Sequence, residues 1–364
     1  MKIINVVGAR PNFMKIAPIQ RVMDATEGIE PFLVHTGQHY DERMSKFFFD
    51  DLQLPQPDVY LNIGSASHAV QTARIMIEFE QVLLKEKPDA VLVVGDVNST
   101  AACSIVASKM GIKIIHVEAG LRSNDRGMPE EINRILTDSI SDLLFITEQS
   151  GLDNLKREGI PDEKVHLVGN VMIDSLIFFK EKAAQSTMLD DLGLEKQSYA
   201  LITLHRPSNV DDPDVFRRLI STFQKIEKEL KLIFPIHPRS RKRISEFGLD
   251  EMIASMPNLK LLDPLGYLDF MNLMHNARVL LTDSGGIQEE TTYLGIPCIT
   301  MRENTERPVT MEVGTNVLVG SDTDMIYEEF KKVINGRAKK GSIPPMWDGH
   351  AAERIVDIIK KTFS

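Results

Sequence analysis

The chain has 364 residues, 43% of them hydrophobic and 26% charged, which is the composition of a folded protein and not of a disordered or membrane-embedded one. Its 42 basic and 52 acidic side chains give a formal net charge of −10, so we do not expect binding to nucleic acid, which requires a basic surface. No apolar run reaches the roughly 20 residues of a membrane helix, and the amino terminus leads straight into a strand instead of a signal peptide. We therefore expect a cytoplasmic protein without a membrane partner.

Apolar strands alternate with helical segments along the whole chain. The expected strands of the first half cover residues 3–7, 32–35, 90–94, 114–117 and 143–146, and those of the second half cover 199–203, 232–236, 279–282 and 298–301. This alternation is typical of an α/β protein in which helices cover parallel sheets.

The length of the chain indicates two domains, because it exceeds the usual size of one. A more polar stretch at residues 183–198 separates the two series of strands, and we expect the join within 169–198. We assign residues 1–170 to an N-terminal domain and 171–350 to a C-terminal domain. An amphipathic helix at about 351–364 follows, and it could pack back on the first domain.

Polar residues stand directly after several of the expected strands. Open parallel sheets bind ligands at the carboxyl ends of their strands, and two such domains facing each other would form a cleft there. The residues in these positions are Arg10, Asp96, Glu118, His205, His237 and Ser284.

The segment LLTDSGGIQEE at residues 280–290 has the pattern of a phosphate site. An apolar strand runs into Ser284, Gly285 and Gly286 and then into a helix, whose first amides and positive dipole end would face an anion. Glu290 lies about one helical turn further on, where its carboxylate could accept hydrogen bonds from ribose hydroxyls. These features suggest a nucleoside diphosphate, although a tight turn without a ligand would look the same.

Three carboxylates in the first half could carry proton transfer at carbon or stabilise a cationic sugar centre. They are Asp96 in GDVNST, Glu118 in HVEAGLRS and Glu131 in MPEEINR. Each also has a structural alternative. Asp96 could cap the following helix, Glu118 could pair with Arg122, and Glu131 could be a favourable first-turn charge after Pro129.

The histidines and cysteines favour acid–base chemistry over metal binding. His205 could donate a proton to a leaving phosphate, and His237 has the same potential but ranks below it. His35 and His39 have helical spacing, but their segment is expected to be a strand end and a loop, so we expect no metal site. Cys103 and Cys298 are far apart in apolar surroundings; we expect two reduced core residues.

The motifs GARPNFMK, GDVNST, HVEAGLRS, MPEEINR, LHRPSNVD, DSGGIQEE and RENTERP occur in this order from the first strand to residue 308. In these motifs the chain resembles the non-hydrolysing UDP-N-acetylglucosamine 2-epimerases. The resemblance implies the glycosyltransferase B-type fold, with two Rossmann-like domains around a central cleft. It also implies interconversion of UDP-GlcNAc and UDP-ManNAc without a cofactor, in an enzyme that is commonly a homodimer.

The same resemblance assigns roles to individual residues. It assigns UDP binding to Arg10, Lys15, Phe270, Ser284, Gly285, Gly286, Glu290 and Arg307, and the chemistry to Asp96, Glu118, Glu131 and His205. Asp96 and Glu131 would serve as base and acid in some order, Glu118 would support C1 or the proton path, and His205 would act on the phosphate.

The C2 hydrogen of the sugar has no adjacent carbonyl to acidify it. Breaking the anomeric bond first makes C1 cationic and the C2 proton acidic, and a carboxylate can then remove it. This leaves a 2-acetamidoglucal and bound UDP. Return of a proton to the opposite face inverts C2 as UDP adds again, provided that water is excluded.

Two positions depart from the family pattern. Leu265 stands where the family commonly has glutamine, shortly before the phenylalanine that meets the uracil. Bacterial members often bind UDP-GlcNAc in a neighbouring activating pocket, built partly from a Gln-His pair and an Arg-Gln pair. Gln38 and His39 match the first pair, but residues 63–68 read IGSASH and lack the second, so allosteric activation stays open.

Other functions fit parts of the same pattern. The nearest alternative is a 2-epimerase of a UDP-2,3-diacetamido-glucuronic acid; we favour the simpler sugar because a proline follows Arg307. A hydrolysing epimerase is less favoured because no fused kinase domain is evident, and a retaining glycosyltransferase would not need three cleft carboxylates. The non-enzymatic alternative is a sensor that binds a UDP-sugar without turnover.

Overall fold

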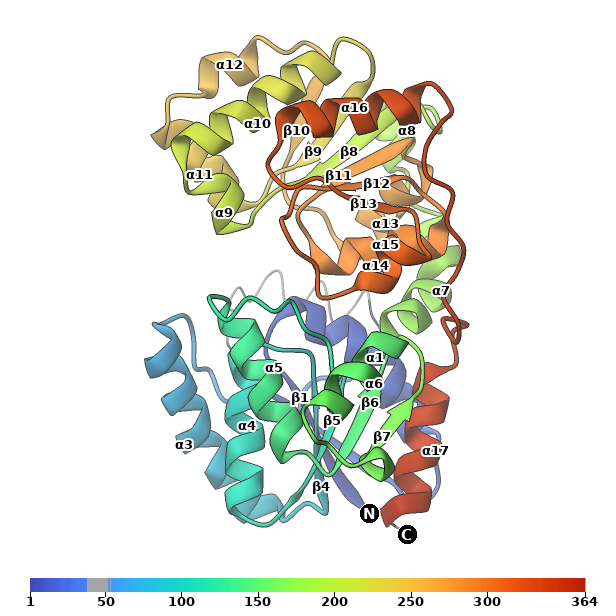
Figure 1. Cartoon of the computed structure of the whole chain (residues 1–364). Coiled ribbons are helices and arrows are strands. Elements are labelled where there is room, and N and C mark those ends of the chain that lie inside the picture. Colours follow the sequence, from blue (N-terminus) through green and yellow to red (C-terminus); the bar gives the residue numbers. More distant parts are fainter. Residues whose placement is uncertain (38–51, 53, 364) are drawn as a thin grey trace. The chain divides into compact units, whose positions relative to one another are not determined.

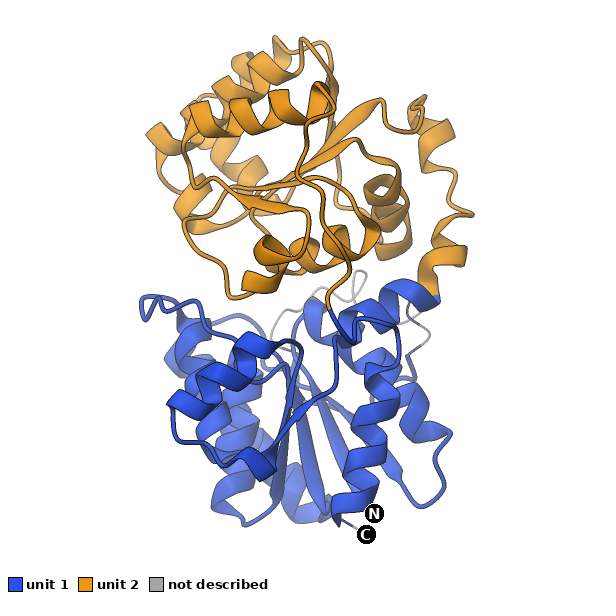
Figure 2. Cartoon of the chain, turned by 45° about the vertical axis from the view of Figure 1, so that its right-hand side comes forward, with its two compact units in different colours: residues 1–178, 345–364 blue, residues 179–344 orange. Residues whose placement is uncertain are grey.

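The computed structural model describes residues 1–37, 52 and 54–363, without the side chain of Arg10. The chain forms two compact units (Figure 2). Unit 1 contains residues 1–178 and 345–364, and unit 2 contains residues 179–344. The boundary at 178/179 falls inside helix α7 (Val171–Ala183), where the sequence suggested 170/171.

Unit 1 is built on a seven-stranded sheet in the order β3-β2-β1-β4-β5-β6-β7, and every pair of neighbouring strands is parallel. Its central strands are almost wholly apolar and buried, because helices cover both faces of a parallel sheet. The strands are β1 (Lys2–Val7), β2 (Glu30–His35), β3 (Val59–Tyr60), β4 (Ala90–Val94), β5 (Lys113–Val117), β6 (Leu143–Ile146) and β7 (Val165–Leu167).

Two groups of helices pack on this sheet. Helices α3 (His68–Glu86), α4 (Asn98–Lys109) and α5 (Pro129–Ile140) lie side by side (Figure 1). Helix α1 (Arg10–Asp24) lies beside α17 (Ala351–Phe363), the last helix of the chain. Helix α6 (Gln149–Arg157) and the short 3-10 helix η1 (Asp162–Lys164) connect β6 to β7. A core of apolar side chains from β1, β4, α3 and α4 lies between the sheet and the first group.

Unit 2 is built on a six-stranded parallel sheet in the order β10-β9-β8-β11-β12-β13. Its strands are β8 (Tyr199–Thr203), β9 (Lys231–Pro235), β10 (Leu259–Leu262), β11 (Val279–Thr282), β12 (Cys298–Thr300) and β13 (Asn316–Leu318). Its helices are α8 (Met188–Leu192), α9 (Pro207–Val210), α10 (Pro213–Ile226), α11 (Pro238–Glu246), α12 (Asp250–Ala254), α13 (Tyr267–Asn276), α14 (Gly285–Leu294), α15 (Pro308–Glu312) and α16 (Thr323–Ile334). A large apolar cluster between this sheet and helices α10 and α16 forms the core.

The strand order of each sheet reverses once near its centre. The reversal lies between β1 and β4 in unit 1 and between β8 and β11 in unit 2. In open α/β sheets the loops at the carboxyl ends of these strands form the ligand crevice. The structure places Asp96 after β4, His205 after β8 and Ser284 after β11, so sequence candidates occupy the switch points of both sheets.

The expected α/β class with two parallel sheets is confirmed, and the nine expected strands are present with ends shifted by at most two residues. Four further strands, β3, β7, β10 and β13, were not expected. Cys103 and Cys298 are confirmed as buried free thiols. Among the described residues no helix is long and apolar enough to cross a membrane.

Candidate active site

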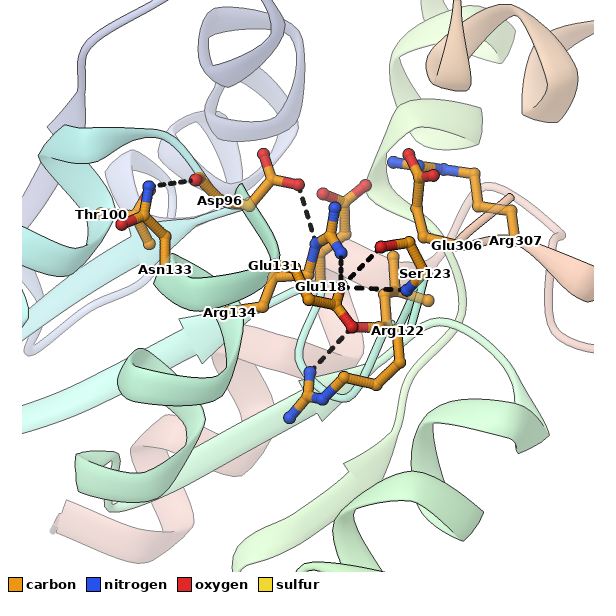
Figure 3. A network of polar contacts seen from close by, with 12 residues as sticks. Asp96, Thr100, Glu118, Arg122, Ser123, Glu131, Asn133, Arg134, Glu306 and Arg307 are labelled. Atoms are coloured by element: carbon orange, nitrogen blue, oxygen red, sulfur yellow. Dashed lines mark hydrogen bonds and ion pairs between the residues drawn. The ribbon is translucent and has the colours of Figure 1, made fainter. Parts of the chain in front are cut away.

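Arg134 joins two of the three candidate carboxylates of unit 1. This arginine of α5 is almost fully buried, and its Nε donates to Asp96 Oδ2 at 2.9 Å. Its Nη1 pairs with Glu131 Oε2, three residues earlier on the same helix. Figure 3 shows the guanidinium between the two carboxylates. A single fixed positive charge therefore holds Asp96 and Glu131 together at the carboxyl end of β4.

Asp96 is held from α5 at both its backbone and its side chain. Its carbonyl accepts a hydrogen bond from Asn133 Nδ2 at 2.9 Å, while its carboxylate accepts from Arg134. The alternative that Asp96 caps α4 is wrong, because Val97 is the N-cap and no side chain caps that helix. About a quarter of the Asp96 side chain is exposed, so its carboxylate remains accessible to a ligand.

Glu131 does more than add a favourable charge to the first turn of α5. Its carboxylate accepts hydrogen bonds from the Ser123 amide at 2.9 Å, the Ser123 hydroxyl at 3.0 Å and the Asn124 amide at 2.9 Å. Charge-assisted bonds of this kind fix a carboxylate firmly. Glu131 is buried, and it ties the loop after β5 to the start of α5.

Glu118 forms a buried ion pair with Lys15 of α1. The alternative of a Glu118–Arg122 pair is wrong, because Arg122 instead contacts Asp138 and Glu158. Glu118 has a φ of +70°, which is rare for a residue with a side chain and is typical of functional turns. The resemblance assigned Lys15 to UDP; the structure places its ammonium at the candidate catalytic carboxylate.

Three other candidates of this half lie wholly or in part outside the described parts of the structure. Arg10 begins α1, but its side chain is outside the described parts. Gln38 and His39, the proposed half of an activating pocket, also lie outside the described residues.

In unit 2 the candidate His205 is paired with Asp283. Its Nδ1 lies 2.9 Å from Asp283 Oδ1, and the Asp283 carboxylate also accepts the backbone N–H groups of His205 and Arg206. Burial disfavours ionisation of Asp283, but His205 and these donors outweigh it and hold the pKa of Asp283 below its usual value. The proton on Nδ1 therefore faces a carboxylate, which leaves Nε2 of the partly exposed ring for a ligand.

The rings of His205 and His237 lie 5.4 Å apart, so the lower-ranked histidine contacts the higher-ranked one. His237 itself caps α11, where its Nδ1 accepts the Arg239 amide. Its place in the structure is thus explained by the helix end and by its contact with His205.

The turn from β11 to α14 has the geometry of an anion site. Ser284 is the N-cap of α14 and its hydroxyl does not cap the helix, while Gly285 and Gly286 supply its first amides. A Cβ on Gly285 would lie 2.8 Å from Glu306 Oε1 and 2.9 Å from Arg307 Nη1. Any larger residue at this position would therefore have to displace one of these two side chains.

Buried arginines adjoin the same helix. Arg307 pairs with Glu289 and Glu306, and Arg302 pairs with Glu306 (the Glu306–Arg307 pair is seen in Figure 3). Burial lowers the pKa of Arg302, and the positive charges of Arg206 and Arg307 add to this effect. Arg206 Nε and Arg302 Nη1 are buried donors without a partner in the described structure. An anion would satisfy these donors, which are costly to leave unbonded.

Glu290 lies further along α14 and is buried. Burial raises its pKa to about 8, with an opposing hydrogen bond from Tyr267 Oη at 3.2 Å and a further increase from the charge of Glu289. Phe270 is half-buried on α13, one turn after Tyr267, and Leu265 is half-buried just before that helix. The candidate uridine residues of unit 2 therefore come from the adjoining helices α13 and α14.

Sequence reasoning missed Arg134, Asp283 and Glu306, which position the candidates that it found. Arg134 stands at the end of the MPEEINR motif, three residues after Glu131, which is the spacing of a helical ion pair. Asp283 directly precedes Ser284, so its place after β11 was a usable signal. For Glu306 the sequence contained no comparable signal.

Comparison with known proteins identifies the family. A family model described as UDP-N-acetylglucosamine 2-epimerase matches residues 21–360. The chain belongs to this family. It is 45% identical, over 98% of both chains, to the UDP-N-acetylglucosamine 2-epimerase of Methanococcus maripaludis. It is also 40% identical to the UDP-2,3-diacetamido-2,3-dideoxy-D-glucuronate 2-epimerase of Pseudomonas aeruginosa, covering 99% of this chain and 100% of that one.

A solved structure agrees with this assignment. The UDP-GlcNAc 2-epimerase of Methanocaldococcus jannaschii, crystallised with UDP-GlcNAc and UDP, has a TM-score of 0.92 and 43% identity to the chain, covering 99% of this chain and 100% of that one. The expected fold class, with two Rossmann-like α/β domains of the glycosyltransferase B type, is confirmed. The chain is an epimerase of this family.

Proposed function

We propose that the chain catalyses the reversible epimerisation of UDP-GlcNAc to UDP-ManNAc at C2. The observation that carries the proposal is the arrangement in which Arg134 holds Asp96 and Glu131 at the end of β4, with Glu118 on the next strand, β5. Two carboxylates that are held together can remove and return one proton at carbon. The full-length similarity to named UDP-GlcNAc 2-epimerases supports the choice of sugar.

The reaction begins with cleavage of the bond between C1 and the phosphate oxygen, whose electron pair leaves with UDP. One of Asp96 and Glu131 then takes the C2 proton, and the C–H electron pair forms the C1–C2 double bond of the 2-acetamidoglucal. In the return steps the other residue donates a proton to the opposite face of C2, and UDP adds again to C1. Glu118, fixed by Lys15, supports the cationic C1.

Unit 2 supplies the groups for the leaving nucleotide. The first amides of α14 and the nearby arginines, with unsatisfied donors on Arg206 and Arg302, stabilise the diphosphate. His205, whose ring is oriented by Asp283, donates a proton from Nε2 to the departing phosphate oxygen. Glu290 accepts hydrogen bonds from the ribose hydroxyls, and Phe270 contacts the uracil. Arg10 would add a further positive charge from unit 1.

The proposal requires no added cofactor, because acid–base side chains and a held leaving group suffice and the sugar is neither oxidised nor reduced overall. A cytoplasmic homodimer remains part of the proposal. Sedimentation velocity of the purified chain tests its dimeric part.

A second substrate stays open because of one specific relative. The Pseudomonas aeruginosa protein, 40% identical over nearly the full length, is named for a UDP-diacetamido-glucuronate. Its substrate differs from UDP-GlcNAc at C3, which is bonded to the reacting carbon, and at C6. Parallel kcat/KM measurements with both UDP-sugars decide between them.

The decisive experiment follows UDP-GlcNAc in heavy water by NMR. We expect UDP-ManNAc to accumulate and deuterium to enter C2 of both sugars. UDP-GlcNAc labelled with ¹⁸O in the bridge between C1 and phosphorus should also scramble its label into non-bridging positions of the β-phosphate. Tight UDP binding without deuterium entry would favour a sensor, and deuterium entry without scrambling would overturn cleavage at C1.

A further inference from the structure

A buried charged network lies behind the two turns that carry Asp96 and Glu118. Its central members are His116 of β5 and Asp138 of α5, both with no exposed surface, and Arg122, whose side chain is almost fully buried. No step of the reaction described above uses them. Three such buried groups would be an expensive way to fill a core that apolar side chains could fill.

The hydrogen bonds fix the charge of the histidine. His116 Nδ1 lies 2.7 Å from Asp138 Oδ1, and His116 Nε2 lies 2.9 Å from the carbonyl oxygen of Gly95. A carbonyl can only accept, and Asp138 is ionised because it also accepts from the Arg122 guanidinium and the Gly120 amide. Both ring nitrogens of His116 therefore donate, which makes the ring an imidazolium.

Each end of the network is hydrogen-bonded to the backbone of a turn that carries a candidate carboxylate. The Gly95 carbonyl belongs to the peptide group between Gly95 and Asp96. The hydrogen bond from His116 therefore fixes the orientation of this peptide plane and, with it, the direction of the Asp96 side chain. Asp138 accepts a hydrogen bond from the Gly120 amide at 3.1 Å, and Arg122 donates one to the Leu121 carbonyl at 2.8 Å. The turn 118–122 therefore keeps Glu118 in its left-handed conformation, with a φ of +70°.

We propose that His116 and Asp138 are positioning residues for the epimerisation, and that they set the distance between the Asp96 and Glu118 carboxylates through the backbone. This inference rests on the proposed function. A network that served only stability would tolerate any substitution that keeps the chain folded. A positioning network is sensitive to which of its two hydrogen bonds is lost.

Two substitutions of His116 separate these roles. In His116→Gln the amide nitrogen reaches the place of Nε2 and can still donate to Gly95, whereas in His116→Asn it reaches only the place of Nδ1. We expect His116→Asn to lower kcat on the order of 10- to 100-fold with an unchanged dissociation constant for UDP. His116→Gln should keep most of the wild-type kcat. His166→Asn, on strand β7 of the same sheet, is the matched control and should leave kcat unchanged.

Equal kcat values for folded His116→Asn and His116→Gln would overturn the proposal. Should His116→Asn fail to fold, Asp138→Asn replaces it, since it keeps the shape of the carboxylate and removes its charge; unchanged kcat in that variant would also overturn the proposal. Amide hydrogen exchange of residues 95–96 and 118–120 gives a readout that needs no turnover. Faster exchange there in His116→Asn than in His116→Gln supports positioning even if the wild type does not epimerise UDP-GlcNAc, and equal exchange contradicts it.

Discussion

Arg134 determines how the two proposed proton-transfer residues can behave. It contacts Asp96 and Glu131 at once, so the negative charges that would repel each other share one positive partner. Protonation of one carboxylate strengthens the hold of the guanidinium on the other. Asp96 and Glu131 should therefore exchange the roles of acid and base between the forward and reverse reactions.

Replacement of Asp96 by asparagine tests its role directly. The amide oxygen can still accept from Arg134, so we expect the site to stay assembled and UDP affinity to be retained. The rate of epimerisation should fall by a factor on the order of 100 or more, because asparagine cannot carry the proton. Steady-state kinetics and UDP titration measure the two quantities.

The matched control for this variant is Asp89→Asn. Asp89 lies at the opposite end of β4, where it accepts the Lys2 amide, and it is exposed. Its kcat should equal that of the wild type. Turnover of Asp96→Asn at the wild-type rate would remove Asp96 from the mechanism.

Glu290 should release a proton when UDP binds. With a pKa of about 8 its carboxyl is mostly protonated at pH 7, whereas ribose hydroxyls donate best to the ionised form. Calorimetry in buffers of different ionisation enthalpy should therefore show a buffer-dependent binding enthalpy near pH 7, and Glu290→Gln should abolish this dependence. A binding enthalpy of the wild type that is the same in every buffer would contradict the expected contact.

The same group makes the free protein less stable at higher pH. Its pKa in the folded state is raised from 4.5 to about 8, so the folded state binds its proton more tightly than the unfolded state does. The contribution of Glu290 to the free energy of unfolding is fully present below pH 4.5 and is lost as the pH rises through about 8. Glu290→Gln should flatten this part of the pH profile.

The types of the candidate residues were predictable from the sequence, but their partners were not. Ser284 and Glu118 stand after strands, which sequence patterns locate. By contrast, the Lys15–Glu118 pair joins residues 103 positions apart, and it replaced the more local pairing with Arg122. Burial of both partners decides that contact, and burial is a property of the assembled sheet and helices.

At the scale of elements, the beginning of α14 combines three devices for an anion: free amides, a dipole and close arginines. Gly285 makes the close approach of Arg307 possible. Gly285→Ala should therefore displace Arg307 or Glu306 and weaken UDP binding about tenfold, equivalent to about 1.4 kcal/mol. Titration of the variant with UDP measures the change.

Gly295 at the other end of α14 provides the control for this variant. It has a φ of +71°, and a Cβ there would meet no atom within 4 Å. Gly295→Ala should lower the free energy of unfolding by about 1 kcal/mol through backbone strain and leave UDP affinity unchanged. If both variants bound UDP equally, the packing around Gly285 would have no part in binding.

The four strands that the sequence did not reveal are the edges of the two sheets: β3 and β7 in unit 1, and β10 and β13 in unit 2. Edge strands are short. Because an edge strand has a neighbouring strand on one side only, it is less buried and needs fewer apolar residues. Central strands such as β4 are buried on both faces and form a clear apolar run. Apolar runs therefore locate the centre of a parallel sheet better than its margins.

At the scale of the whole molecule, the chain completes unit 1 only with its last residues. Trp347 is fully buried and its Nε1 donates to the Thr147 carbonyl at 3.1 Å, while Asp174 accepts the first amides of α17. The sequence predicted the amphipathic helix, but its pattern alone did not show which unit it joins. Contacts with residues about 170 to 200 positions earlier in the chain determine that the helix belongs to unit 1.

Trp347→Ala should destabilise unit 1 by about 3–5 kcal/mol, because it leaves a large cavity and an unpaired carbonyl. Chemical denaturation followed by far-UV circular dichroism measures the loss. Ile343→Ala, four residues earlier in unit 2, is the matched control, since this side chain is 51% exposed and its removal should change stability by no more than about 0.5 kcal/mol. Similar losses in the two variants would mean that the return of the chain contributes little to unit 1.

This return of the chain also sets an order of events during protein synthesis. Unit 2 is made from one uninterrupted stretch, so all of residues 179–344 are synthesised before the Trp347 anchor. The carboxylates of unit 1 are made early, yet their sheet cannot receive α17 until all of unit 2 has been synthesised. A chain that is cut after residue 344 should therefore contain the whole of unit 2 together with a unit 1 that lacks Trp347 and α17.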